Sequence, residues 1–281
     1  YTSGQGAIPW YNGNRFAKNN DIVVVSINYR LGALGFADLT HLGEEFATSN
    51  INGTLDQIAA LKWVQDNIAA FGGDPSRVTI AGESAGGFSV ATLMACPSAE
   101  GLFQQAIPQS GACHHTLPQE ASKKVTEHFL GELGLNSAVE LEAASAEDIL
   151  AAQKATTAHF AQGAGQVNSL GVAVSPFYPV HGNTTLPEDP LTSARNGASD
   201  TVRVLTGSNK DETTLWSVGE TDQEKLERTV AGYQAEEALA VYQRTRPEAS
   251  SHDLLVAITT DHMFRIPAIR LAEARQGAAA T

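Results

Sequence analysis

The chain has 281 residues, of which 42% are hydrophobic and 17% are charged, and its formal net charge is −13 at pH 7. This composition is typical of a globular protein rather than a disordered one, and the length is enough for one large α/β domain or two smaller ones. The acidic balance argues against binding to nucleic acid or to anionic membrane surfaces. No apolar run approaches about 18 residues, so the sequence predicts no membrane span.

Hydrophobic periodicity predicts a parallel sheet in the first half of the chain. Residues 21–29 are almost continuously β-branched, which is typical of a strand buried on both faces. Thr54 and Gln57 form a capping-box pattern at the start of a helix, and Gly72-Gly73 ends that helix. A strand, a helix and a strand follow at residues 77–81, 87–95 and 106–109. This alternating order predicts helices on both faces of the sheet and ligand binding at the carboxyl ends of its strands.

The second half of the chain is predicted to be mainly helical. An Ala-, Glu- and Leu-rich stretch indicates a helical insertion over about residues 118–165, of the kind that covers a pocket. A strand is predicted at residues 201–207, followed by a loop with Asp211 and Glu212 and then by helices that include residues 266–274. Because both carboxylates follow a strand, we expect them at the edge of the sheet where the other parallel strands end.

Cysteine and histidine patterns indicate neither a disulfide framework nor a metal site. The two cysteines, Cys96 and Cys113, are interpreted as buried, unpaired thiols. The sequence has no C-x-x-C or H-E-x-x-H motif, so no metal is predicted. His114 and His115 are adjacent on an expected loop, where neighbouring side chains usually point apart, and we interpret both as surface histidines.

The pentapeptide Gly82-Glu83-Ser84-Ala85-Gly86 is the most informative motif of the chain. A G-x-S-x-G pattern between a strand and a helix builds a sharp turn that exposes a serine nucleophile. We expect both Gly82 and Gly86 to be needed, because a side chain at either position would collide where strand and helix cross. The motif therefore predicts Ser84 as a nucleophile at the carboxyl end of a strand.

A serine nucleophile needs a histidine base, an acid that orients the histidine, and amide donors for the oxyanion. Glu212 is the best candidate for the acid and Asp211 is the second, although two exposed loop carboxylates would have the same local sequence. His252 and His262 follow these acids, but both lie in stretches predicted to be helical, and we interpret them as packing or surface residues. From the residues alone, the chain contains two of the three triad members.

Several blocks of residues occur in one order along the chain: 28–36 (NYRLGALGF), 55–75, 82–87 (GESAGG), 109–111 (QSG), 179–187 and 207–212. Their residues and their order resemble those of the type B carboxylesterases, the cholinesterase-like esterases of the α/β-hydrolase superfamily. The resemblance covers essentially the whole chain. It implies an α/β-hydrolase fold with a mostly parallel central sheet, incomplete at both ends, in a single partial domain over residues 1–281.

The resemblance also implies roles for individual residues. Ser84 would be the nucleophile, Glu212 the acid and the Ala85 amide one oxyanion donor, while Gly82, Glu83 and Gly86 would complete the nucleophile turn. The substrate would be a small-molecule carboxylic ester, hydrolysed through an acyl-enzyme without a cofactor.

Two parts of the family's catalytic machinery are not found in the sequence. The family's other oxyanion amides come from an H-G-G loop that we expect immediately before Tyr1, and its catalytic histidine is expected beyond Thr281. The resemblance therefore implies the middle portion of a longer enzyme. Thr213 departs from the family, in which glycine commonly follows the glutamate.

Two alternatives to an esterase stay open. A carbamate or amide hydrolase would use the same triad, because the acyl-enzyme chemistry is shared. A non-catalytic cholinesterase-like adhesion or binding module is the other alternative, but such relatives typically lose the serine, and Ser84 is present. The residues do not indicate an oligomeric state.

Overall fold

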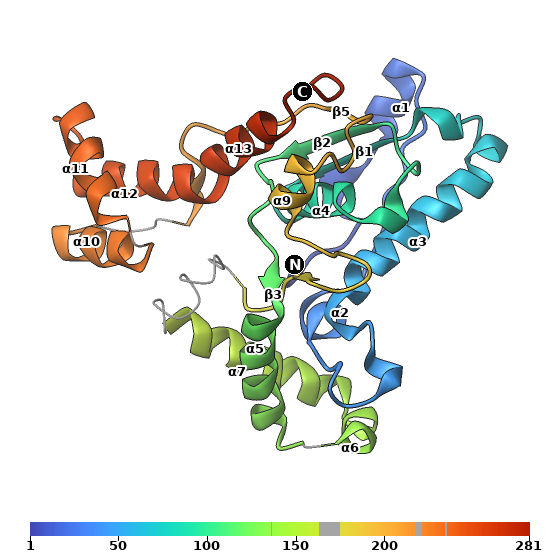
Figure 1. Cartoon of the computed structure of the whole chain (residues 1–281), viewed down its shortest axis with the longest axis horizontal. Helices are drawn as coiled ribbons and strands as arrows, with labels where there is room; N and C mark the ends of the chain where they lie inside the picture. The colour runs from blue at the N-terminus through green and yellow to red at the C-terminus, as the bar shows by residue number, and fades with distance from the viewer. Residues whose placement is uncertain (136, 163–174, 217–220, 234) are drawn as a thin grey trace.

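The computed structural model of the chain describes residues 1–135, 137–162, 175–216, 221–233 and 235–281 (Figure 1). The strands are β1 (Thr79–Glu83), β2 (Gln105–Gln109), β3 (Leu117–Pro118), β4 (Val180–His181) and β5 (Arg203–Val204). The helices are α1 (Asn14–Asn20), α2 (Gly32–Phe36), α3 (Asn52–Asn67), α4 (Ala85–Met94), α5 (Gln119–Leu133), α6 (Ala138–Ala143), α7 (Ala146–Gln162), α9 (Pro190–Arg195), α10 (Gln223–Gly232), α11 (Glu236–Thr245), α12 (Ser251–Thr260) and α13 (Ile266–Ala274). Within these ranges the structure contains no helix that could span a bilayer.

The sheet next to the serine motif is parallel, as the alternating strand and helix order predicts. Its strands follow the order β1-β2-β5, and Ile80, Ala106 and Val204 lie side by side in the register of the three strands. A further parallel bridge joins Gln109 to Gly207 beyond the end of β5. Strands β3 and β4 form a separate parallel pair.

One face of this sheet packs on helices α3 and α4. Ile80, Ala106 and Val204 belong to one buried cluster with apolar residues of both helices. Helix α4 is buried over all of residues 87–94, which explains why its sequence lacks a polar face. The opposite face of the sheet is exposed at Thr79, at Ala81 and at Leu205, whose exposure is 68%.

The strand predicted over residues 21–29 is absent from the structure. These residues form no strand, and the Ile and Val side chains among them are 37–48% exposed. A β-branched run favours extended backbone, but a strand also needs a neighbouring chain to accept and donate its ladder hydrogen bonds. Among the described residues, no such neighbour pairs with this stretch.

The capping-box prediction for α3 is also wrong. The helix begins at Asn52, and its N-cap residue, Ile51, makes no side-chain cap hydrogen bond. Thr54 and Gln57 are buried inside the first two turns, where they pack instead of capping. The predicted end is confirmed, because a short 3-10 turn after α3 is closed by Gly72 with a φ of 82°.

Helices also form where the sequence predicts them in the second half. Helices α5, α6 and α7 occupy most of the predicted insertion, although residue 136 and residues 163–174 lie outside the described residues. Helix α13 covers Ile266–Ala274 as expected. Helices α10 and α12 share a buried cluster centred on Leu226 and Leu255, and a π-helical turn, η8 (Asp261–Arg265), joins α12 to α13.

Backbone lies directly against backbone where β1 turns into α4. A Cβ atom on Gly82 would lie 2.4 Å from the carbonyl carbon of Gly86, so no side chain fits at position 82. The same requirement predicted for Gly86 is wrong, because a Cβ atom there would meet nothing within 4 Å. The second close crossing instead involves Gly111, whose Cβ atom would lie 2.7 Å from the backbone of both Gly87 and Ser84.

The two motif glycines therefore provide a matched test. We expect Gly82→Ala to destabilise the protein by about 2 kcal/mol or more, because the added methyl group forces the strand and the helix apart. We expect Gly86→Ala to change stability by less than about 1 kcal/mol, because a helical Ala fits there. Urea unfolding followed by circular dichroism measures both values, and equal destabilisation by the two changes would contradict the close crossing at Gly82.

Candidate active site

Ser84 occupies a strained turn between the end of β1 and the start of α4. Its φ is 53° and its ψ is −117°, a conformation that costs a non-glycine residue about 1–3 kcal/mol. Two hydrogen bonds hold it there: its N–H donates to the Gln109 carbonyl and its own carbonyl accepts from the Phe88 N–H, both at 2.9 Å. The side chain is half-buried at the carboxyl end of the strand, as the motif predicts.

Amide donors lie next to this serine. Ala85 is the first residue of α4, so its N–H belongs to the group of helix N-terminal amides that have no acceptor within the helix. The positive end of the helix dipole is at the same place. An oxyanion that develops beside Ser84 would therefore meet a donor and a favourable potential.

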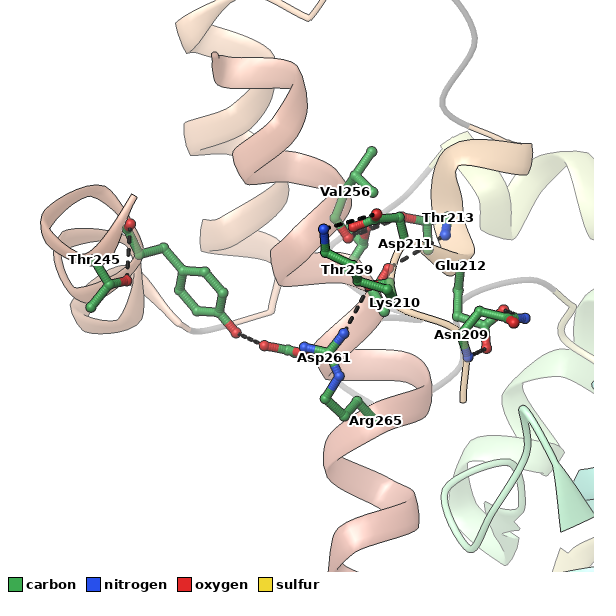
Figure 2. A network of polar contacts seen from close by, with 12 residues as sticks. Asn209, Lys210, Asp211, Glu212, Thr213, Thr245, Val256, Thr259, Asp261 and Arg265 are labelled. Atoms are coloured by element: carbon green, nitrogen blue, oxygen red, sulfur yellow. Dashed lines mark hydrogen bonds and ion pairs between the residues drawn. The ribbon is translucent and has the colours of Figure 1, made fainter. Parts of the chain in front are cut away.

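Glu212 begins a short 3-10 helix, η7 (Glu212–Leu215), and its carboxylate is held within its own loop. The Asn209 N–H donates to Oε1 at 2.7 Å and the Asn209 side-chain amide donates to Oε2 at 3.2 Å (Figure 2). Asp211 differs, because its half-exposed side chain has only the exposed Lys210 ammonium, at 4.0 Å, as an ion-pair partner in the described structure. Of the two predicted acids, Glu212 is the one with a defined orientation.

The carboxylates of Glu83 and Glu212 interact electrostatically. Partial burial raises the pKa of the Glu83 carboxyl, and the Glu212 carboxylate raises that pKa further. Glu83 precedes Ser84 in the chain, so the loop of residues 208–212, called the acid loop after the predicted role of Glu212, lies on the same side as the turn that contains Ser84. The Ser110 N–H donates to the Gly207 carbonyl at 2.9 Å and so joins the loop after β2 to the segment that leads to Glu212. The residue before Ser110, Gln109, accepts the hydrogen bond of the Ser84 N–H.

The histidines that follow Glu212 contact other groups. The His252 Nδ1 lies 3.4 Å from the Thr221 hydroxyl. The His262 ring stacks on Tyr233 with the ring centroids 4.0 Å apart, and burial lowers the pKa of His262. Within the described part of the chain, the Ser84 hydroxyl has no histidine as a hydrogen-bond partner.

The interpretation of His115 as a surface residue is wrong, and His114 is half-buried. His115 is buried and stacks on Phe88 with ring centroids 3.4 Å apart, and burial lowers its pKa to about 3. His114 lies 3.4 Å from the Arg270 guanidinium, and burial, followed by that charge, lowers its pKa to about 4. The loop after β2 packs against α4 and α13, since Ala112 and Cys113 share a buried cluster with Ala91 and Leu271. Its local sequence does not indicate this tertiary contact.

The cysteines do not provide a second nucleophile. Cys96 and Cys113 are free and buried, and burial raises the pKa of both thiols to about 12. A thiol with such a pKa is a poor source of thiolate at neutral pH. Among the described residues, no group of three or more His, Cys, Asp or Glu side chains could hold a metal ion.

Sequence reasoning missed the residues that hold the acid loop in place. These are Asn209, which binds the Glu212 carboxylate, and Arg265, which donates to the Lys210 carbonyl at 2.8 Å. Asn209 precedes the acid by three residues, a spacing typical of a side chain that closes a turn. No local signal identifies Arg265, because it lies 55 residues from its acceptor.

Comparisons with known proteins identify related sequences over the whole chain. A family model described as "Carboxylesterase family" matches residues 1–281. The para-nitrobenzyl esterase of Bacillus subtilis (strain 168) is 38% identical over 281 residues, which cover 97% of this chain and 54% of that protein. The phenmedipham hydrolase of Pseudarthrobacter oxydans is 32% identical over 287 residues, which cover 97% of this chain and 53% of that protein.

Solved structures of esterases superpose on most of the chain. A carboxylesterase of Geobacillus stearothermophilus gives a TM-score of 0.85 at 36% identity and covers 98% of this chain and 58% of its own. A PNB esterase gives a TM-score of 0.83 at 37% identity and covers 99% of this chain and 58% of its own. The chain thus spans little more than half the length of these relatives, and the predicted α/β-hydrolase fold is confirmed. The chain belongs to the carboxylesterase family.

Proposed function

We propose that this chain contains the nucleophile and the acid of a serine enzyme that hydrolyses small-molecule carboxylic esters. The observation that supports this most is the backbone of Ser84, which is strained and fixed at the N-terminus of α4. Strain of this kind persists only where surrounding contacts enforce it, and it concentrates at functional sites. Membership of the carboxylesterase family supports ester chemistry at this serine.

In the proposed reaction, the Ser84 Oγ attacks the acyl carbonyl carbon while its proton passes to a histidine. The carbonyl oxygen becomes an oxyanion, which the Ala85 N–H stabilises. The tetrahedral intermediate expels the alcohol, which takes the proton from the histidine, and leaves an acyl-serine. Water, deprotonated by the same histidine, then attacks the acyl-serine and releases the carboxylic acid and the free hydroxyl.

Glu212 is proposed as the acid that orients this histidine. Each oxygen of its carboxylate accepts one hydrogen bond from Asn209, and a carboxylate has lone pairs left for an imidazole N–H. We assign the histidine to a part of the protein outside these 281 residues, since His252 and His262 contact Thr221 and Tyr233. We also assign the remaining oxyanion donors to a part of the protein outside these 281 residues.

A carbamate or amide hydrolase is a second candidate, because the same residues would form the corresponding acyl-enzyme. One relative is named a phenmedipham hydrolase and another a probable N-octanoylanthranilate hydrolase, of Rhodococcus erythropolis, so names differ among relatives of similar identity. Turnover of a matched ester, carbamate and anilide with p-nitrophenol or p-nitroaniline as the leaving group separates the candidates. We expect the ester to give the largest kcat/KM.

The assignment of Ser84 and Glu212 predicts unequal losses of activity. In the full-length protein we expect Ser84→Ala to lower kcat for a p-nitrophenyl ester on the order of 10⁶-fold, because the nucleophile is removed. We expect Glu212→Gln to lower kcat on the order of 10⁴-fold, because the histidine loses its orienting charge. Asp211→Asn is the matched control and should stay within about twofold. A larger loss with Asp211→Asn than with Glu212→Gln would reverse the assignment.

The exposed apolar side chains predict low solubility for the 281-residue chain when it is purified by itself. Leu205 and the apolar side chains of residues 21–29 are exposed, and such surfaces promote association. We expect this chain to scatter light strongly and to be nearly inactive on a p-nitrophenyl ester, since losing one oxyanion donor alone costs about 100- to 1,000-fold. Purified short and full-length proteins are compared at equal concentration. A monomeric short form with turnover within about tenfold of the long form would contradict this expectation.

A further inference from the structure

The loop that contains Glu212 is attached to the C-terminal helices at two points, one on each side of the glutamate (Figure 2). Before the glutamate, the Arg265 guanidinium donates to the Lys210 carbonyl at 2.8 Å. After it, the Thr213 hydroxyl lies 2.6 Å from the Thr259 hydroxyl and donates to the Val256 carbonyl at 3.2 Å. Both anchors come from α12 and the π-helical turn η8 that follows it.

The first anchor depends on the two-pronged geometry of an arginine. One guanidinium nitrogen of Arg265 lies 2.7 Å from Asp261 Oδ1, while another donates to the Lys210 carbonyl. Asp261 also accepts a hydrogen bond from the Tyr242 hydroxyl, whose pKa is raised to about 12 by burial and by that carboxylate. The Tyr242 hydroxyl thus stays a neutral donor, and Asp261 is held between a donor and a cation. A planar guanidinium can satisfy Asp261 and the loop together, which an ammonium cannot do as well.

The second anchor is a buried contact between hydroxyl groups. Thr213 has an exposure of 4%, and Thr259 and Thr260 are also buried, with exposures of 7% and 0%. The Thr213 N–H also points to the Thr260 hydroxyl at 3.4 Å. Buried polar groups with fixed partners hold their backbone in one place, because leaving any of them unpaired costs free energy. A glycine at position 213, common in the family, would have no hydroxyl for this contact.

The glutamate itself makes no comparable contact with another element. Among the described residues, its carboxylate accepts hydrogen bonds only from Asn209, within the same loop. The other end of the loop is fixed to the sheet at Gly207, which is bridged to Gln109. The location of the Glu212 carboxylate is therefore set by what holds Gly207, Lys210 and Thr213.

We propose that Arg265 and Thr213 are positioning residues, which hold the Glu212 carboxylate where a catalytic histidine can use it. This inference rests on the proposed function, because it requires Glu212 to be the acid. Neither residue touches a reacting atom, so each would act only through the glutamate. Misplacement of a catalytic group by about 1 Å can cost about a hundredfold in rate, so a loss of either anchor should be visible in kcat.

The test is a set of double-mutant cycles in the full-length protein. Arg265→Met and Thr213→Val are made alone and together with Glu212→Gln, and kcat and KM are measured with a p-nitrophenyl ester. Arg228→Met is the control, since the Arg228 guanidinium is 68% exposed and lies 3.6 Å from Glu224 on the same helix. Thermal unfolding by circular dichroism shows that each variant is folded.

The inference predicts losses that depend on the glutamate. We expect each single change to lower kcat about tenfold to a hundredfold with KM altered less than about threefold. In the Glu212→Gln background we expect the same changes to cost less than about twofold, because the group that they position is already lost. Arg228→Met should stay within about twofold in both backgrounds.

The acid assignment of Glu212 and the positioning roles of Arg265 and Thr213 are contradicted by different results. If Glu212→Gln leaves kcat unchanged, the acid assignment of the proposed function is wrong and the positioning roles are wrong with it. If Glu212→Gln lowers kcat but the anchor changes cost nothing, or cost the same factor in both backgrounds, only the positioning inference is wrong. Should Arg265→Met fail to fold, Thr213→Val decides by the same comparison, because without the Thr213 hydroxyl the Thr259 hydroxyl can still donate its proton to the Leu255 carbonyl, 2.7 Å away.

Discussion

Direct contact of backbone with backbone around Ser84 determines the positions of β1, α4 and the loop after β2. Gly82, Gly87 and Gly111 each leave room for a neighbouring main chain that a Cβ atom would meet at 2.4–2.7 Å. This proximity allows the Ser84 N–H to reach the Gln109 carbonyl at 2.9 Å, and the bond holds the serine at a positive φ that its side chain disfavours. The strained conformation of Ser84, the proposed nucleophile, is thus a consequence of close packing, and the free energy of the core next to it maintains the strain.

The same sheet brings the acid loop to the serine across more than 120 residues of sequence. Pairing of β2 with β5 places Gly207 beside Gln109, so the chain leaves the sheet next to the nucleophile turn before it reaches Glu212. Parallel strands end at one edge, and this geometry makes loops neighbours that are distant in the sequence. The ladder determines only where the loop starts, however, because β5 has two residues and its hydrogen bonds end at Gly207.

Sequence reasoning succeeded where local pattern and burial agree. The strand before Ser84 and the apolar helix after it are short, continuous signals, and both formed with bounds within a few residues of those predicted. It failed where the structure of a segment depends on contacts with distant parts of the chain. Residues 21–29 have strong strand propensity but pair with no neighbouring strand among the described residues. His115 is buried only because its loop packs against Phe88 in the folded protein. When residues far away in the sequence bury a polar side chain, the immediate sequence neighbours of that side chain do not reveal its burial.

Local sequence is also insufficient to identify the residues that contact the loop of Glu212. Glu212 could be selected from its place after a strand, whereas Arg265 and the partners of Thr213 lie 43–55 residues away from the groups that they bind. A π-helical turn at residues 261–265 presents Asp261 and Arg265 together, and such turns are rare and often occur at functional sites. Under the proposed function, helix α12 and its π-helical turn would contribute to the geometry of the site while remaining outside the group of residues that would meet the substrate. A catalytic carboxylate located by its sequence still depends, for its orientation, on side chains that only the tertiary structure identifies.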